Sequence, residues 1–206
     1  MSQRALLLAI MEPALAMEEE FNDWYDLEHL PQMLAIPGID TALRFVAVDG
    51  WPRYLAVYDL KEFAVLRSTT YRLITGSGFT PWSRRILSRV KGWQRLTFKQ
   101  ESPGDAIIDE DCRALLVFVF KGRPDLRPAA RSFSGEPGVT QVRCFGPGEE
   151  TNDGAALLVE AGAVGALPRP SGSNLASMLG LVFSAAYVRY SRADPVAKFH
   201  ALEKSE

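Results

Sequence analysis

The chain has little of what marks a redox, metal-binding or disulfide-bonded protein. Its 206 residues include only two cysteines and two histidines. Cys112 and Cys144 lie in or beside apolar runs and form no CxxC or Cys/His spacing, so we expect small buried side chains and no need for an oxidising compartment. The two histidines are far apart in the sequence, which gives little basis for a metal held by protein ligands. We therefore predict no metal site.

An excess of positive charge is missing as well. The formal net charge is −2, which argues against a general nucleic-acid or anionic-membrane partner because both need a basic surface. One local cluster of basic residues is an exception. We interpret it as a solvated helix face that offsets the acidic segment Glu18–Glu28, with attraction of an anionic ligand or partner as the alternative. The cluster comprises Arg84, Arg85, Arg89, Lys91 and Arg95.

Long apolar runs and nucleotide or hydrolase motifs are also absent. No apolar run approaches the ~20 residues that a membrane-spanning helix needs. Glu12 and Pro13 interrupt the apolar N-terminal run too early for a signal peptide. The sequence contains no GxGxxG after a strand, no GxxxxGK[ST], no HExxH and no GxSxG. These absences predict a soluble, cytoplasmic protein with neither a membrane nor a nucleic-acid partner.

The chain does contain one pattern that occurs twice. Residues 5–60 hold an apolar run, a longer segment, Pro37-Gly38, and two alternating runs separated by a turn. Residues 114–160 repeat this order around Pro137-Gly138. The copies differ most before the Pro-Gly pair, where the second copy contains no His, Trp or Tyr. Because only the first copy has His, Trp and Tyr side chains in this segment, the repeat predicts a functional site in the first half alone.

Hydrophobic periodicity predicts strand, helix, strand, strand, helix, strand in the first copy, which is the ferredoxin-like βαββαβ order. The predicted strands are Ala5–Met11, Ile39–Val48, Arg53–Leu60 and Gly92–Lys99. The predicted helices are Met17–Ala35, kinked or ended near Leu30 by Pro31, then Glu62–Ile74 and Trp82–Val90, with a loop at Thr75–Thr80. The second copy is predicted to contain strands Arg113–Phe120, Val139–Phe145, Ala155–Gly162 and Gly180–Tyr190, helix Asp125–Phe133 and loop Ala163–Asn174.

These elements predict an α+β fold with two similar halves. The first ferredoxin-like repeat covers residues 1–100, a polar linker covers 101–111, and a second, degenerate repeat covers 112–206. Each antiparallel sheet has helices on one face and an apolar second face, so we expect the two sheets to pack face to face. His200 falls in a short terminal helix pattern, Pro195–Leu202, and is predicted to lie on the surface.

His29 is the first candidate for chemistry. Tyr25 and Asp26 precede it by four and three residues, so both would project near it from one helix, with Trp24 toward the other edge of that stripe. An imidazole with an ordinary pKa near ~6.5, beside a phenol and a carboxylate, can exchange a proton at neutral pH. The alternative is a structural histidine on an amphipathic helix.

Arg44 and several aromatic residues are the other candidates. Arg44 lies in an apolar strand and needs an anionic partner, either Asp26 or Glu28 in a salt bridge or a substrate carboxylate. The aromatic side chains belong either to the core or to a pocket for a flat ligand. They are Tyr54 and Tyr58 on the third predicted strand and Trp93 on the fourth, with Tyr71 and Trp82 flanking a glycine-containing loop that can form a lid.

One segment resembles a known family signature. The residues Phe21-Asn22-x-Trp24-Tyr25-Asp26-x-Glu28-His29-x-Pro31, followed by Pro37-Gly38 and Arg44, resemble EthD-like proteins of the dimeric α+β-barrel superfamily. The resemblance covers roughly residues 4–100 and is weak beyond them. It implies that two βαββαβ units form a barrel, here within one chain, and that a pocket between sheet and helices has His29 at its edge.

The resemblance implies a small enzyme that acts on an apolar or aromatic carbonyl-type compound without a tightly bound cofactor. Isomerase, cyclase, dehydratase and cofactor-free oxygenase chemistry all remain open. His29 would be the general acid/base, with Asp26 or Glu28 orienting it, Tyr25 donating a hydrogen bond and Arg44 holding an anionic oxygen. Trp24, Tyr58 and Trp93 would complete the substrate site. The alternatives are a non-catalytic ligand-binding protein and a haem protein with His29 as axial ligand. A homodimer is also possible.

Overall fold

The alternating apolar strands join into one antiparallel sheet that closes on itself. The computed structural model describes residues 3–148, 154–168 and 180–191. Within them the strand order around the barrel is β1-β3-β2-β8-β5-β7-β6-β4, returning to β1. The strands are β1 Ala5–Glu12, β2 Ile39–Asp49, β3 Tyr54–Leu60, β4 Lys91–Ser102, β5 Ala114–Phe120, β6 Val139–Pro147, β7 Ala155–Ala161 and β8 Leu181–Arg189.

The two predicted facing sheets pair at their edges, which forms the barrel that the resemblance implies. β2 pairs with β8, for example Phe45 opposite Arg189, and β4 pairs with β6, for example Gln100 opposite Phe145. The two four-stranded halves are therefore one closed sheet. Closure gives the backbone groups of all four edge strands a partner, which an open pair of sheets would leave unsatisfied. β4 consequently extends to Ser102, into residues predicted to be linker.

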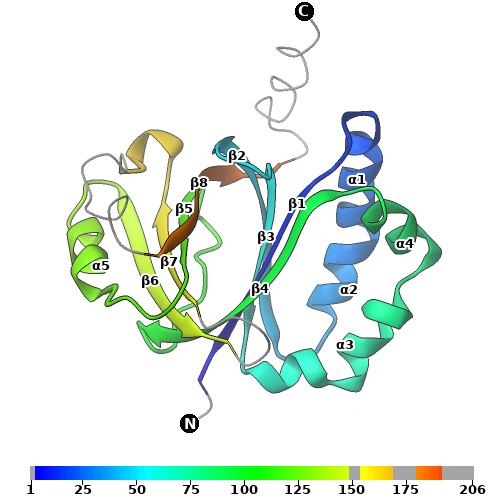
Figure 1. Cartoon of the computed structure of the whole chain (residues 1–206), viewed down its shortest axis with the longest axis horizontal. Helices are drawn as coiled ribbons and strands as arrows, with labels where there is room; N and C mark the ends of the chain where they lie inside the picture. The colour runs from blue at the N-terminus through cyan, green and yellow to red at the C-terminus, as the bar shows by residue number, and fades with distance from the viewer. Residues whose placement is uncertain (1–2, 149–153, 169–179, 192–206) are drawn as a thin grey trace, which may run out of the picture.

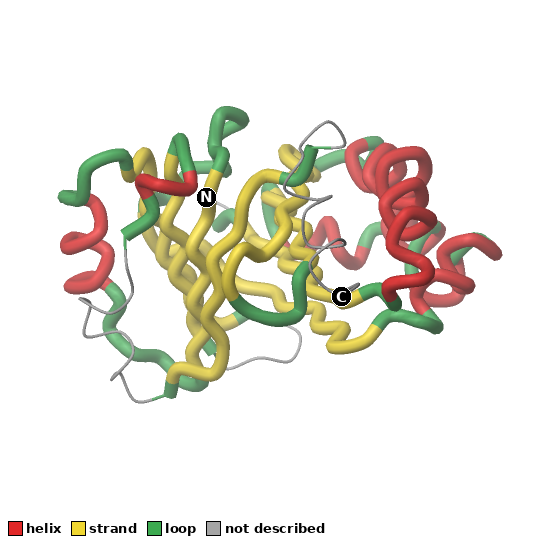
Figure 2. Tube along the Cα trace, turned by 90° about the horizontal axis from the view of Figure 1, so that it is seen from above, coloured by secondary structure: helices red, strands yellow, loops and turns green. Residues whose placement is uncertain are grey.

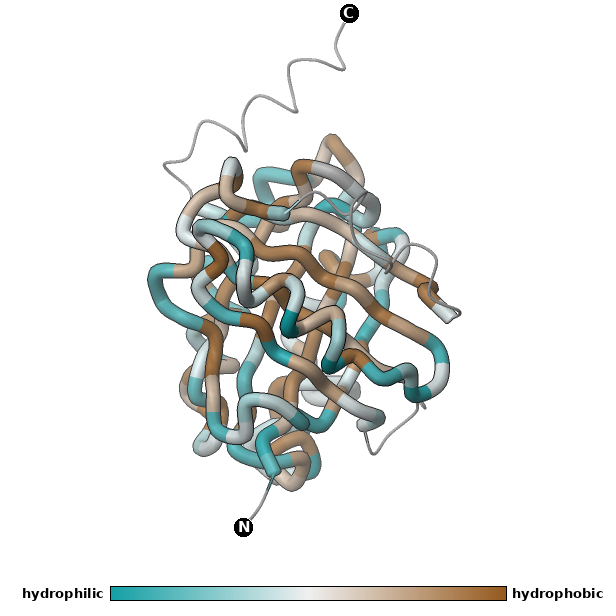
Figure 3. The backbone as a smooth tube through the Cα atoms, turned by 90° about the vertical axis from the view of Figure 1, so that its left-hand side faces the viewer, coloured by the Kyte–Doolittle hydropathy of each residue, from teal (hydrophilic) through white to brown (hydrophobic). Residues whose placement is uncertain are grey.

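The side chains on the two faces of a strand pack in different hydrophobic cores, one inside the barrel and one beneath the helices. On β3, Leu55 and Val57 point into the barrel, whereas Tyr54 and Tyr58 point outward beneath the helices. All seven residues of β3 are buried as a result. Figure 3 shows hydrophobic stretches along the strands and mostly hydrophilic residues at the turns. Buried strands of this kind read as apolar runs, which is why the sequence identified them well.

Helices cover the outside of the barrel unequally. Four helices, α1 Glu18–Trp24, α2 Leu30–Leu34, α3 Thr69–Leu73 and α4 Pro81–Leu87, lie on the side of β1, β3 and β4, and α5 Arg127–Ser134 lies on the opposite side (Figures 1 and 2). In the described residues, no helix has the length and apolar composition that crossing a membrane would take. The layer between α1–α4 and the sheet is the thicker one and contains the candidate site.

Several predicted helices are shorter than expected. The second, Glu62–Ile74, is a 3₁₀ segment Phe63–Arg67 followed by α3, because Ser68 has an extended backbone and caps α3 through its hydroxyl. The loop at Thr75–Thr80 contains a 3₁₀ turn, Gly76–Gly78. The predicted loop after β7 contains another, Val164–Ala166, and its residues 169–174 lie outside the described residues, as does His200.

A buried ion cluster links the two halves inside the barrel. The guanidinium of Arg143 on β6 donates to Asp59 on β3 and to Glu160 on β7, each at 2.6 Å, and all three side chains are at most 1% exposed. Asp59 also accepts hydrogen bonds from the Thr41 hydroxyl and the Ile108 amide. Charges so far from water need such partners to offset their desolvation. Both predicted buried thiols, Cys112 and Cys144, are buried and free.

Removing the central cation of this cluster is expected to cost far more than removing a surface cation. Arg143→Leu leaves two buried carboxylates unpaired, so the free energy of unfolding should fall by about 3–5 kcal/mol in urea denaturation. Arg127→Leu is the matched control, because Arg127 pairs with Asp125 at 2.7 Å but is 75% exposed; its effect should be much smaller, since water screens this pair. Equal effects of the two substitutions would contradict a stabilising role for the cluster.

Candidate functional site

The helix that carries the candidate residues contains a π-helical turn. α1 ends at Trp24, the π-helical turn covers Tyr25–His29, and α2 begins at Leu30. The Leu30 amide donates to the Tyr25 carbonyl, five residues earlier. Pro31 explains the position of the turn, because its ring clashes with the carbonyl four residues before it in a regular helix. The sequence predicted a kink near Leu30; the helix instead widens before it and continues.

The π-helical turn brings Trp24 onto His29. The two rings stack with centroids 4.6 Å apart and an interplanar angle of 15°. In a regular α-helix, residues five apart point about 140° away from each other, so this stack needs the wider turn. The Tyr25 ring meets the imidazole edge-on at 5.4 Å. The imidazole is thus fixed by two aromatic rings rather than by a carboxylate.

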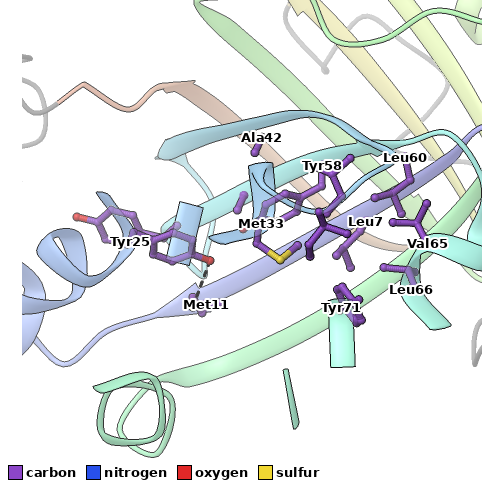
Figure 4. Packing of buried hydrophobic residues seen from close by; sticks show 14 of the residues in the cluster. Leu7, Met11, Tyr25, Met33, Ala42, Tyr58, Leu60, Val65, Leu66 and Tyr71 are labelled. Carbon is purple, nitrogen blue, oxygen red and sulfur yellow. Dashed lines mark hydrogen bonds between the residues drawn. The ribbon is translucent and has the colours of Figure 1, made fainter. Parts of the chain in front are cut away.

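His29 borders a cavity of about 70 Å³ between the outer face of the sheet and the helices. The cavity is lined mostly by apolar side chains. The lining residues are Leu7, Ala9, Met11, Trp24, Tyr25, His29, Met33, Tyr58, Tyr71, Thr75, Phe79, Leu87, Trp93 and Arg95. Figure 4 shows Leu7, Met33 and Tyr58 packed together beside Tyr25, whose hydroxyl is directed at Met11. This volume holds about two water molecules and is well below the ~300–1,000 Å³ of a typical ligand site.

The imidazole is buried and lacks a partner for one nitrogen. His29 is 9% exposed, and its Nδ1 atom has no hydrogen-bond partner among the described residues. Burial, together with the nearby positive charge of Arg44, lowers the pKa of His29 to about 4. The predicted proton exchange near an ordinary pKa is therefore corrected: the resting ring is neutral throughout the physiological range.

Two phenols accompany the imidazole. Burial raises the pKa of Tyr25 to about 12 and raises the pKa of Tyr58 well above its usual value. Both phenols therefore keep their protons and can act as hydrogen-bond donors. Among the described residues, the Tyr25 hydroxyl donates to a weak acceptor, the Met11 sulfur at 3.9 Å, and it also interacts with the Tyr58 hydroxyl. An oxygen atom of a ligand would be a better acceptor at this position.

Arg44 and Asp26 form a structural pair away from the cavity. The guanidinium of Arg44 is 4% exposed and donates to Asp26 at 2.7 Å and to Asn22 at 2.6 Å. It also lies over the Tyr25 ring at 4.3 Å and the Tyr190 ring at 4.0 Å. Asp26 is thus paired with Arg44 and does not orient His29. Neither Arg44 nor Asp26 lines the cavity, so they hold the helix on the sheet instead of contacting a ligand there.

Glu28 also has a role different from the predicted one. Its carboxylate accepts hydrogen bonds from the Trp24 indole at 3.2 Å, the Thr80 hydroxyl at 2.6 Å and the Ser83 hydroxyl at 3.0 Å. Thr80 caps α4, and Ser83 lies in its first turn. Glu28 therefore ties the π-helical turn to α4 and holds the indole that stacks on His29. Trp24 itself lines the cavity.

The rest of the cavity lining includes residues that the sequence analysis proposed for the site and one, Arg95, that it did not. Trp93 is 49% exposed and lines the cavity, and Tyr58 lines it from the buried side. Tyr71 joins the lining, whereas the other predicted lid residue, Trp82, does not; its indole donates to Glu20. Arg95, assigned to a basic surface cluster, lines the cavity. Arg95 follows Trp93 by two residues on the same strand, so both side chains point to the same face, and this spacing could have predicted its position.

The described residues contain no group of three or more His, Cys, Asp or Glu side chains placed to hold a metal ion. The two buried thiols offer no nucleophile either, because burial raises the pKa of Cys112 to about 12 and that of Cys144 to about 11. His29 and the phenols of Tyr25, Tyr58 and Tyr71 are therefore the groups of the cavity lining that can exchange or share a proton.

Comparison with solved structures places the fold among dimeric α+β barrels. An anthrone oxidase-like protein matches with a TM-score of 0.58 at 8% identity, covering 93% of this chain and 92% of that chain. A haem-binding protein from Thermus thermophilus matches with a TM-score of 0.57 at 8% identity, covering 97% and 96%. A mutant chlorite dismutase from Candidatus Nitrospira defluvii matches with a TM-score of 0.52 at 8% identity, covering 97% and 96%. At such identities the likeness shows the fold alone.

No protein-family model matches the chain, and no curated protein matches it. The relation to EthD-like proteins therefore stays a prediction from the sequence motif. What the fold comparison supports is the α+β-barrel fold.

The depressed pKa of His29 predicts a specific loss of stability in acid. An unfolded His29 binds a proton below pH ~6.5 whereas the folded one does not until about pH 4, so folding becomes less favourable as the pH falls between these values. Wild-type protein should lose about 3 kcal/mol more unfolding free energy between pH 7 and pH 4 than His29→Gln does. Urea denaturation at the two pH values measures this difference. An equal loss of unfolding free energy in the wild type and in His29→Gln would show that the ring is not desolvated.

Proposed function

We propose that the protein is a small EthD-like enzyme in which neutral His29 removes a proton from a small carbonyl-type compound. The observation that carries the proposal is the unpaired Nδ1 atom of His29 beside a cavity. Leaving a buried polar atom unsatisfied costs about 1–3 kcal/mol, and such atoms need an explanation. A ligand atom that completes this hydrogen bond in the occupied state is the explanation we favour.

The polar groups of the cavity suit a substrate with an acidic C–H next to an oxygen. His29 accepts the proton, and the hydroxyl groups of Tyr25 and Tyr58 donate hydrogen bonds to the oxygen on which negative charge develops. Their raised pKa values keep both phenols protonated for this task. The apolar lining excludes water and strengthens these hydrogen bonds. Enolisation of this kind is the first step shared by isomerisation, cyclisation, dehydration and cofactor-free oxygenation of carbonyl compounds.

The low pKa of His29 decides how it can act. A ring with a pKa of about 4 is a weak base in the empty cavity. The imidazolium that forms would lie beside the new negative charge of the substrate, which stabilises the cation and opposes the effect of burial. The resting ring carries no proton to donate as an acid at neutral pH. His29 is therefore the base of the first step and an acid only after it.

The fold itself supports a duplicated origin for this barrel. β4-β1-β3-β2 and β8-β5-β7-β6 are the two consecutive halves of the closed strand order, and each group comes from one half of the chain. We propose residues 1–100 and 112–206 as tandem repeats joined by residues 101–111, with the chemistry in the first repeat. Because one chain supplies both half-barrels, a homodimer is not needed to close the barrel and stays a prediction.

A binding protein without catalysis is the second candidate. Its support is the commitment of Asp26 and Glu28 to structural contacts, which leaves His29 without an orienting carboxylate. The small cavity also suits a protein that holds a ligand rather than one that turns it over. Both candidates predict binding next to His29, and only the enzyme predicts proton exchange.

A haem does not fit the residues of this cavity. The macrocycle is far larger than a space of about 70 Å³. We therefore assign no step to haem, although structural neighbours of this fold include a haem-binding protein.

Hydrogen–deuterium exchange tests the proposed proton transfer without knowledge of the natural substrate. Small 1,3-dicarbonyl compounds are incubated with the protein in D₂O, and loss of the acidic C–H signal is followed by NMR. The wild type should accelerate exchange of at least one compound, and His29→Gln should reduce that rate ~10²–10⁴-fold. The matched control is His200→Gln, the same change at the only other histidine, which should retain full activity.

Two further results complete this test. Tyr58→Phe should lower the exchange rate up to ~10-fold, because one neutral hydrogen bond is lost. The second-order rate constant kcat/KM should be constant above pH 5 and fall as His29 becomes protonated near pH 4. Exchange that is unchanged in His29→Gln would refute His29 as the base, and binding without exchange would favour the binding protein.

A further inference from the structure

We propose that Tyr71 is the catalytic acid of this cavity and gives a proton to the substrate oxygen while His29 takes one from carbon. The inference rests on the proposed function and extends it by a second residue that transfers a proton. The sequence assigned Tyr71 only to a lid. The observation that gives it a chemical role is the hydrogen bonding of its hydroxyl group.

The hydrogen bonds of the Tyr71 hydroxyl restrict where its own proton can point. The Nε and Nη2 atoms of Arg95 donate to the Tyr71 oxygen at 3.3 and 3.2 Å. A guanidinium has donors and no acceptor, so the phenol cannot donate its proton to Arg95. Among the described residues, nothing accepts a hydrogen bond from this hydroxyl. Tyr71 lines the cavity, so an oxygen atom of a ligand there is the acceptor that this arrangement leaves open.

This count of donors and acceptors does not need a free charge on Arg95. The guanidinium has further interactions besides these two hydrogen bonds, and we assign it no ligand. Its contribution is two N–H groups that contact the phenol oxygen before and after the proton leaves. Hydrogen bonds to a charged oxygen are stronger than those to a neutral one, so both contacts strengthen as the phenolate forms. Arg95 is therefore a positioning residue, and Tyr71 is the catalytic one.

The backbone around Tyr71 fixes the position of the phenol. The Tyr71 amide donates to the Ser68 hydroxyl at 3.1 Å, and the Tyr71 carbonyl accepts from the Thr75 hydroxyl at 2.8 Å. The side chain is 7% exposed. A donor that is already held in place needs no reorganisation when charge develops on the substrate, which makes its hydrogen bond most effective in the transition state.

The acid and the base approach the cavity from different elements. Tyr71 comes from α3 and His29 from the π-helical turn. In Figure 4, Tyr71 lies apart from Tyr25, the phenol that meets the His29 ring edge-on, and Met33 is drawn between them. Tyr58 neighbours both phenols, because Tyr25 and Tyr71 each contribute to its raised pKa. A small ligand in this cavity can therefore contact His29 and Tyr71 at two different atoms.

The two proton transfers balance without another reactant. Nδ1 of His29 takes a proton from the carbon beside the carbonyl group, and the electron pair of that C–H bond forms a C=C bond. The π pair of the carbonyl group forms an O–H bond with the proton of Tyr71, which leaves an enol, an imidazolium and a phenolate. Return of both protons restores the residues. When carbon regains its proton at a different position, as an unsaturated ketone allows, the net reaction is an isomerisation.

Deuterium exchange into acetylacetone tests the role of Tyr71. Tyr71→Phe removes one oxygen atom and should reduce the protein-catalysed rate ~10²–10⁴-fold, as expected for loss of an acid. Loss of a hydrogen bond alone would reduce it up to ~10-fold. Tyr187→Phe is the matched control, because this buried phenol donates to the Pro52 carbonyl and does not line the cavity. It should retain the wild-type rate, and both variants should keep the wild-type circular dichroism spectrum.

A double-mutant cycle tests whether Arg95 acts through Tyr71. Arg95→Leu removes both donors to the phenol oxygen and should reduce exchange ~10-fold in the wild-type background. The same substitution should have no further effect in Tyr71→Phe, because the group that it positions is already missing. Arg95→Lys, which keeps a donor, should recover part of the rate. Equal factors for Arg95→Leu in both backgrounds would contradict the positioning role.

Carbonyl-labelled ¹³C-acetone gives a readout that does not depend on turnover, and it is small enough for a cavity of about 70 Å³. The ¹³C signal of a carbonyl group moves downfield when its oxygen accepts a hydrogen bond. The wild type and Tyr187→Phe should shift the acetone signal downfield by equal amounts. Tyr71→Phe should shift it less, because the donor that we assign to the ligand oxygen is missing.

Two results would overturn the inference: a reduction of exchange by less than about tenfold in Tyr71→Phe, or the same acetone shift in Tyr71→Phe as in the wild type. Its failure is distinct from that of the proposed function. Loss of exchange in His29→Gln together with nearly normal exchange in Tyr71→Phe would retain the base and remove the acid. Loss of exchange in Tyr71→Phe together with normal exchange in His29→Gln would retain the acid and remove the base.

Discussion

The site depends on one backbone constraint, the π-helical turn that precedes Pro31. The turn spans Tyr25–His29 and lets five-residue neighbours share a face, so Trp24 stacks on His29. Glu28 then holds the Trp24 indole and ties the turn to α4, and Asp26 pairs with Arg44 on the sheet. Each of these contacts orients the imidazole indirectly. Because π-helical turns are rare and concentrate at functional sites, the turn is itself an argument that this helix positions His29 for a ligand.

Much of the fold could be predicted from the sequence, because buried strands read as continuous apolar runs between turn residues. The barrel was expected from the family resemblance, and local sequence patterns alone do not predict its closure. Pairing of β2 with β8 and of β4 with β6 joins residues far apart in the chain, and local patterns do not encode such contacts. The same limit hid the ion cluster of Arg143, Asp59 and Glu160, since each residue looks like an isolated charge in its own strand.

The sequence predicted which residues lie near His29 on its helix. It did not predict the hydrogen-bond and ion-pair partners of those residues. His29, Tyr25 and Trp24 are brought together, because helical spacing places neighbours correctly to within a turn. Asp26 and Glu28 were assigned to His29 on α-helical spacing, and the π-helical turn directs them elsewhere. The low pKa of His29 follows from burial and from Arg44, neither of which a sequence displays. Arg95 was read as part of a surface cluster because its strand face could not be assigned from charge alone.

The most direct test of this account is the pKa of His29 itself, measured by NMR titration of the imidazole in the intact protein. The ring should stay neutral down to about pH 4, because it is desolvated inside the cavity and faces the positive charge of Arg44. Titration near the ordinary value of ~6.5 would show a solvated ring. That result would remove both the buried cavity at His29 and the chemistry assigned to it.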